Sequence, residues 1–111
     1  MKRNIGMIQL EETEEAWKGL LREELADAGH FEIHCWEAET EQIRAALEFG
    51  TEKDSSWEYG TVIAGAVTPE FRAFLLELPC PAEEGKRTPF YSLFLDNGFF
   101  SEHYGAELYH L

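Results

Sequence analysis

Residues 31–36 have the sequence Phe31-Glu32-Ile33-His34-Cys35-Trp36, and their side chains alternate in character along the segment. Successive side chains of a β-strand point to opposite faces of a sheet. One face would therefore carry Phe31, Ile33 and Cys35, and the other His30, Glu32, His34 and Trp36. The pattern predicts a strand that is covered on one side and partly exposed on the other.

Three helices are predicted around this strand, over residues 13–28, about 39–49 and 68 to about 78. Apolar side chains recur on each of them at helical spacing and would point inward. They are Trp17, Leu20, Leu21, Leu25 and Ala28, then Ile43, Ala46 and Leu47, then Phe71, Phe74, Leu75 and Leu78. Gly29 and Gly50 would follow the first two helices, with Gly29 as a C′ residue. Thr68-Pro69-Glu70 would begin the third with an N-cap residue followed by proline.

Further strands are predicted on both sides of the third helix. Residues 60–67, Gly-Thr-Val-Ile-Ala-Gly-Ala-Val, carry no charge and do not alternate, which is typical of a central strand buried on both faces. Asn97-Gly98 between two apolar runs predicts a hairpin in which both turn residues have positive φ. Residues 5–10 predict a short first strand, residues 51–58 and 82–89 are predicted loops, and residues 106–111 either extend the hairpin or form a last strand.

These elements predict one globular domain over residues 1–111, of the α/β or α+β class. Three helices would pack on a mixed sheet of four or five strands, in the order (β)αβαβαββ. The C-terminal hairpin would turn at Asn97-Gly98.

The charge of the chain is strongly negative and unevenly distributed. Its formal net charge is −13, and residues 11–58 alone carry 15 acidic against four basic side chains. Part of this acidity belongs to the predicted start of the first helix, where the helix dipole favours carboxylates. A negative field repels nucleic acid and anionic membranes and attracts basic proteins. The only basic patches are Lys2-Arg3 and Lys86-Arg87, so nucleic-acid binding is not expected.

Size, hydropathy and cysteine content predict a soluble cytoplasmic protein. The longest stretch without a charge, residues 59–69, is far too short to cross a membrane. The apolar part of Met1 to Leu10 is too short for a signal peptide and is followed at once by two glutamates. Cys35 and Cys80 lie in apolar settings, as expected of two reduced, packed thiols.

No motif in the chain identifies a reaction, and no cofactor, metal site or catalytic residue is predicted. His30, Glu32 and His34, joined by Glu102-His103 or His110, could in principle contribute to a zinc site, but their spacing matches no strong metal signature. Cys35 and Cys80 lack the cationic surroundings that activate a thiolate. Carboxylates near aromatics, namely Glu32, Glu37, Glu58, Glu102 and Glu107, form no defining pair.

Aromatic side chains mark the best candidates for binding. Phe99 to Gly105 combine two phenylalanines, an acid, a histidine and a tyrosine after a tight turn, although ordinary packing of Phe99 or Phe100 in the core is favoured. Trp36 and Trp57 could lie on a rim. The candidate binding residues are His34, Trp36, Trp57, Glu102, His103 and Tyr104.

The function most consistent with these features is non-catalytic binding of a basic protein partner. One alternative is a small-molecule-binding domain or small enzyme, with a pocket near the C-terminal hairpin. Another is a homo-oligomer that associates through a sheet edge or the hairpin. A deep pocket that collects the candidate residues would favour the enzyme, and a flat acidic surface would favour the protein partner.

Overall fold

The computed structural model describes residues 5–111, which form one seven-stranded antiparallel sheet and three helices. Its strands are arranged in the order β1-β7-β6-β5-β2-β4-β3. The strands are β1 (Gly6–Met7), β2 (His30–Trp36), β3 (Thr51–Lys53), β4 (Gly60–Ala66), β5 (Ser92–Leu95), β6 (Phe99–Glu102) and β7 (Glu107–His110). The helices are α1 (Glu14–Ala26), α2 (Thr40–Leu47) and α3 (Pro69–Glu77). None of these helices is long and apolar enough to cross a membrane.

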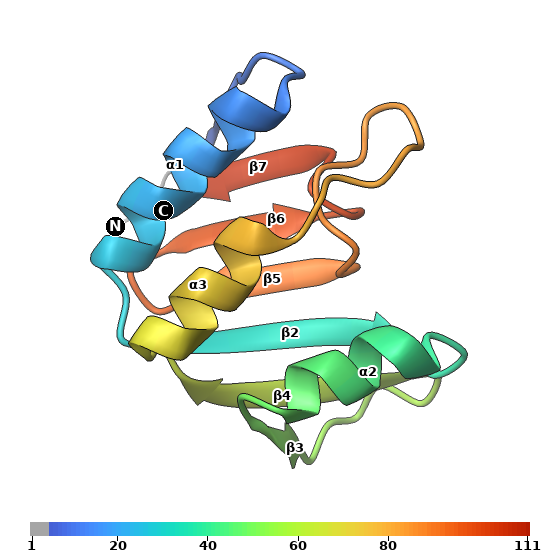
Figure 1. Cartoon of the computed structure of the whole chain (residues 1–111). Coiled ribbons are helices and arrows are strands. Elements are labelled where there is room, and N and C mark those ends of the chain that lie inside the picture. Colours follow the sequence, from blue (N-terminus) through green and yellow to red (C-terminus); the bar gives the residue numbers. More distant parts are fainter. Residues whose placement is uncertain (1–4) are drawn as a thin grey trace.

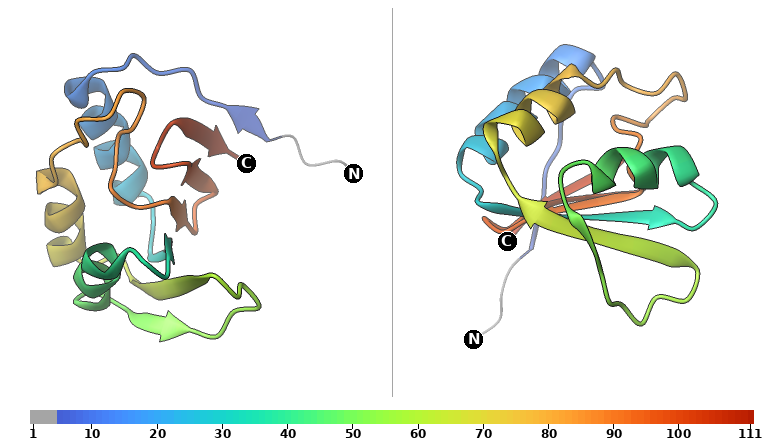
Figure 2. Two further views of the ribbon diagram at one scale, coloured as in Figure 1. Left: turned by 90° about the vertical axis from the view of Figure 1, so that its right-hand side faces the viewer. Right: turned by 60° about the horizontal axis from the view of Figure 1, so that its bottom comes forward.

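All three helices cover the same face of the curved sheet, and no helix covers the other face (Figures 1 and 2). The core lies between the two layers. Phe31 of β2 stacks on Phe71 of α3 with ring centroids 3.8 Å apart, and Trp17, Leu21 and Leu25 of α1 are buried beside them. The alternation in β2 therefore has the predicted meaning: Phe31, Ile33 and Cys35 are buried under the helices.

The predictions of a mixed sheet and of four or five strands were wrong. Every strand pair is antiparallel. After α2 the chain first forms the edge strand β3, and a hairpin then returns it as β4, which therefore pairs antiparallel with β2. The predicted order of elements was incomplete in two places: β3 was not predicted because it has only three residues, and β7 is one of the two alternatives predicted for residues 106–111. Thr51–Lys53, in the predicted loop, form the fully exposed β3, and residues 107–110 form β7 as a last strand.

The small, uncharged residues of β4 have a different structural role from the one predicted. Only its middle, Val62 and Ile63, is buried, while Ala66 is exposed, so the strand is not covered on both faces throughout. Its glycines instead permit close approach. A Cβ on Gly65 would lie 2.6 Å from the carbonyl oxygen of Phe49, and a Cβ on Gly60 would lie 2.1 Å from the ring of Trp57.

The predicted helices are present, with two errors at their ends. Thr13 and Thr68 cap α1 and α3 by accepting hydrogen bonds from Ala16 N and Phe71 N. Gly29 is not a C′ residue with positive φ; its N–H instead donates to Asp96. Leu47 does not point into the core but is 42% exposed at the end of α2.

The predicted hairpin joins β5 to β6 at Asp96-Asn97-Gly98, but its turn differs in type. Only Gly98 has positive φ, at 101°, and its N–H donates to Leu95 O. A three-residue connection of this kind needs one residue in that region, rather than the two of the predicted Asn-Gly turn.

Candidate functional site

The face of the sheet that carries no helix, here called the open face, collects most of the aromatic side chains outside the core. Strand register places its members side by side: Glu32 lies opposite Phe94, Phe94 opposite Phe100, and Phe100 opposite Tyr109. Two more aromatics, Trp57 and Tyr91, join from the loops. The open face comprises Glu32, His34, Trp36, Trp57, Tyr91, Phe94, Phe100, Glu102, Glu107 and Tyr109.

One part of the open face is a row of rings that crosses four strands. The Tyr109 and Phe100 rings stack with centroids 5.0 Å apart, Phe100 and Phe94 follow at 5.4 Å, and Phe94 and His34 at 4.9 Å. The three aromatics of this row are half-buried. Because each ring covers part of its neighbour, the row is an ordered apolar surface.

A second part, here called the aromatic corner, consists of Trp36, Trp57 and Tyr91. The Trp36 ring is 4.8 Å from that of Trp57 and 4.9 Å from that of Tyr91, measured between centroids. The indole of Trp57 lies over Gly60 and fills the space that a side chain there would need. His34 connects the corner to the row, since its ring is 5.9 Å from Trp57.

Carboxylates flank these rings at two places. Glu32 Oε1 lies 2.8 Å from His34 Nε2, and Glu32 Oε2 accepts a hydrogen bond from Lys53 Nζ at 3.1 Å. Partial burial raises the pKa of Glu32, but the hydrogen bonds from His34 and Lys53 outweigh it and leave the pKa below its ordinary value. This carboxylate is therefore negative at neutral pH.

The stability that Glu32 contributes is predicted to depend on pH. A carboxyl whose pKa is lower in the folded chain stabilises the fold above its unfolded value, here 4.5, and loses that effect as pH falls through the folded value. Glu32→Gln should therefore lower the unfolding free energy at pH 6, and this loss should shrink below about pH 4.5. Urea unfolding across this range measures it. Glu23→Gln, on the exposed side of α1, is the control; an equal effect of both variants would contradict the prediction.

The second carboxylate site lies where β6 and β7 meet. Glu102 and Glu107 are directly opposite each other, an arrangement that is unfavourable for like charges. Ser92 Oγ donates to Glu102 at 2.9 Å, and Tyr109 Oη donates to Glu107 at 2.7 Å. The bond from Tyr109 lowers the pKa of Glu107 and raises that of Tyr109. Within residues 5–111 no lysine or arginine forms an ion pair with either glutamate.

Of the predicted binding residues, His34, Trp36 and Trp57 are adjacent, and Glu102 is linked to them through Ser92, which lies opposite His34. The two others, His103 and Tyr104, lie beside the open face at the turn that follows β6, here called the rim. His103 and Tyr104 form the turn between β6 and β7 and have positive φ, 54° and 62°. Both rings contact that of Tyr91, at centroid distances of 5.7 and 5.4 Å.

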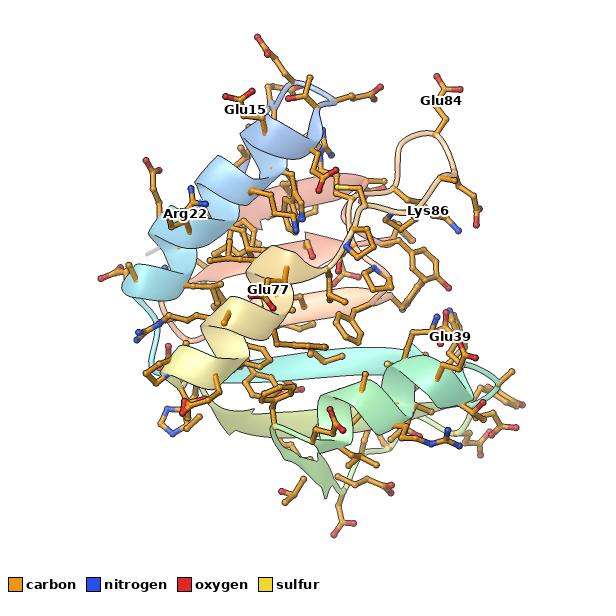
Figure 3. All side chains as sticks on the ribbon, in the orientation of Figure 1. Glu15, Arg22, Glu39, Glu77, Glu84 and Lys86 are labelled. Atoms are coloured by element: carbon orange, nitrogen blue, oxygen red, sulfur yellow. The ribbon has the colours of Figure 1, made fainter. Side chains whose placement is uncertain are left out.

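Tyr104 is also hydrogen-bonded to the N-cap residue of α2. Its hydroxyl donates to Glu39 at 2.9 Å, and Lys86 Nζ lies 4.2 Å from the centre of its ring. Glu39 and Lys86 lie at the same end of the molecule (Figure 3). Burial, followed by the bond to Glu39, raises the pKa of Tyr104 to about 12. Tyr104 is therefore a neutral hydrogen-bond donor that holds the rim in place.

Six residues of the open face were not among the predicted binding residues: the carboxylates Glu32 and Glu107, and the aromatic residues Tyr91, Phe94, Phe100 and Tyr109. Along β5 and β6, Phe94 and Phe100 alternate with the buried Leu93, Leu95 and Phe99 and therefore lie on the other face of the sheet. This alternation could have been used to predict that both phenylalanines are outside the core. Neither Tyr91 nor Tyr109 could be assigned without knowing which strands pair. Of the two phenylalanines considered for the core, Phe99 is buried and Phe100 is on the open face.

The histidines do not converge. Each contacts a different carboxylate: His30 with Asp96, His34 with Glu32, His103 with Glu107 and His110 with Glu24. No three of the metal-binding side chains within residues 5–111 are close enough to hold an ion together. The four pairs are thus separate contacts in different parts of the fold.

The cysteines are placed unfavourably for nucleophilic chemistry. Burial raises the pKa of Cys35 to about 12, with a further contribution from Glu39. Burial also raises the pKa of Cys80. Both thiols are therefore protonated at neutral pH, and the thiolate is the reactive form.

One hollow lies away from the candidate residues. It is formed by the start of α1 and residues 80–87, and neither His34 nor Trp57 lines it. Tyr104 alone of the candidates lines another hollow, with Glu39 and Lys86. Glu32 and Phe94 of the open face line a further hollow with His30 and Asp96, and none of the candidate residues lines it.

Comparison of the chain with models of protein families, with curated proteins and with solved structures found no match.

Proposed function

We propose that this chain is a non-catalytic protein that binds a basic protein partner through the open face. The observation that carries the proposal is the combination, on one uncovered sheet face, of half-exposed aromatic rings with Glu32, Glu102 and Glu107. Aromatic side chains are enriched in the centres of protein interfaces, where they supply most of the binding energy.

Charge supports a basic partner in particular. The whole chain has a net charge of −13, which attracts positively charged proteins over a distance of about one Debye length. On the open face itself, the opposed Glu102 and Glu107 would be relieved of their mutual repulsion by a cation from outside the chain. Electrostatic attraction would mainly raise the association rate, and the rings would supply affinity.

The proposal includes a cytoplasmic location. Cys35 and Cys80 are both free thiols, and free thiols persist in reducing compartments.

The test is a comparison of two charge-reversed variants. The immobilised chain is incubated with extract of its own cells, and bound proteins are eluted with rising salt and identified. Glu102→Lys changes the open face, whereas Glu77→Lys makes the same change of charge on α3, on the helix-covered side (Figure 3). A basic protein should elute with salt, bind the Glu77→Lys variant and fail to bind the Glu102→Lys variant.

Two results would refute the proposal. One is equal retention of every captured protein by both variants, which would place binding elsewhere or make it depend on net charge alone. The other is capture that salt does not weaken. Light scattering of the purified chain is measured in parallel, and a dimer that Glu102→Lys dissociates would assign the open face to self-association instead.

A further inference from the structure

We propose that the aromatic corner binds an arginine side chain of the basic partner. This inference rests on the proposed function and specifies the chemical group that the open face recognises. Two observations lead to it: the position of the Trp57 ring and the carboxylates connected to the corner.

Trp57 is presented as a platform. The missing side chain of Gly60 leaves room for the six-membered ring of the indole against β4, the Tyr91 ring lies nearly parallel to it with ring centroids 6.1 Å apart, and the residue stays half-exposed. Trp36 meets this ring at an interplanar angle of 64° and forms a wall beside it, and it is itself 36% exposed. Indole rings attract cations more strongly than the rings of tyrosine or phenylalanine.

Carboxylates surround the corner on several elements. Glu39 at the start of α2 accepts a hydrogen bond from Trp36 N, and Glu58 follows Trp57 directly in the chain. Glu102 is linked through Ser92 to the position next to His34. These carboxylates come from three different segments, so a cation bound at the corner would lie in a region of negative charge. Two lysines lie near this region, and each is already engaged: Lys53 pairs with Glu32, and Lys86 lies over the ring of Tyr104 and pairs with Glu83.

These features favour arginine over lysine. A guanidinium is planar, so it can stack on an indole and still direct its N–H groups sideways to carboxylates. An ammonium group is more strongly hydrated and gains less from a flat ring beside it. The corner offers a flat ring with acceptors around it, which matches the guanidinium.

The experiment uses two peptides of equal charge, hexa-arginine and hexa-lysine, titrated calorimetrically into the folded chain at one salt concentration. A cation over a partly exposed indole gains a factor of about two to five in affinity, and arginine should gain more of it than lysine, so hexa-arginine should bind a few times more tightly. Trp57→Ala should remove this preference. Tyr59→Ala, which deletes a 65% exposed ring from the same loop but outside the corner, should keep it.

Gly60→Ala provides an independent variant that retains the indole. A Cβ at this position would meet the Trp57 ring, which belongs to a loop residue and can move aside, so the ring should be displaced and the arginine preference lost. Circular dichroism checks that each variant is folded.

Equal binding of the two peptides by the unchanged chain would overturn the inference. So would an arginine preference that survives both Trp57→Ala and Gly60→Ala. If both peptides still bind, with an affinity that salt and Glu102→Lys reduce, the proposed function stands and only the arginine site is refuted. The proposed function fails separately if Glu102→Lys has no more effect than Glu77→Lys.

Discussion

Phe71→Ala is expected to lower the free energy of unfolding by about 3–5 kcal/mol, the largest effect of any single substitution considered for this chain. Phe71 is fully buried at the start of α3 and contacts three other rings. Its stacking on Phe31 joins the helix layer to the middle of the sheet. Truncation would remove this contact and leave a cavity that the packed rings cannot close. Urea unfolding followed by circular dichroism measures the loss.

Phe100→Ala is the matched control, because it removes the same side chain from the opposite face of the sheet. Phe100 is only half-buried and stacks on Phe94 and Tyr109 without a helix above it. Its removal should cost clearly less, about 1–2 kcal/mol, because the site is open to solvent and no closed cavity remains. Equal losses for the two variants would contradict the division of the sheet into a core face and an open face.

Gly65→Ala is expected to destabilise the chain by about 1–3 kcal/mol, although it adds a single methyl group. The new Cβ would lie 2.6 Å from Phe49 O and 3.0 Å from the Cα of Gly50. Both are backbone atoms of the segment that follows α2, so the helix end would have to move away from β4. The same urea titration measures this effect.

Gly19→Ala, in the middle of α1, separates this clash from a general effect of replacing glycine. No atom lies within 4 Å of the added Cβ, and alanine is the better helix former by about 1 kcal/mol. The substitution at Gly19 should therefore raise stability while that at Gly65 lowers it. Stabilisation by both would show that α2 does not dock against β4 as described.

The open face differs from an ordinary solvent-exposed sheet face in the side chains that it carries. A solvent-exposed sheet face usually carries polar side chains between its buried ones. Here β5, β6 and β7 place Phe94, Phe100 and Tyr109 there, in one row. The proposed basic partner would cover this row, and the flanking glutamates are the basis for the charge proposed for it.

Local sequence was sufficient to predict the elements whose signals lie within a few residues. The alternation of residues 31–36 predicted both β2 and its division into a buried and an exposed side. Thr13 and Thr68 begin helices because their hydroxyls satisfy backbone N–H groups three residues ahead. The Asn97-Gly98 pair between two apolar runs predicted the hairpin after β5. Local sequence also placed His34, Trp36 and Trp57 among the candidate binding residues.

Only the tertiary structure decided which of these segments meet. β2 pairs with β5, about 60 residues further along the chain, and this register brings Phe94 beside Glu32 and Ser92 beside His34. Nothing within either segment specifies that pairing, because it depends on how all three helices share one face of the sheet. The seat of Trp57 on Gly60 and the contact of Tyr91 with four rings of the corner and rim likewise arise from chain segments that are distant or irregular. Alternation therefore established that the sheet has an exposed face, whereas long-range packing determined that this face is a continuous aromatic and acidic surface.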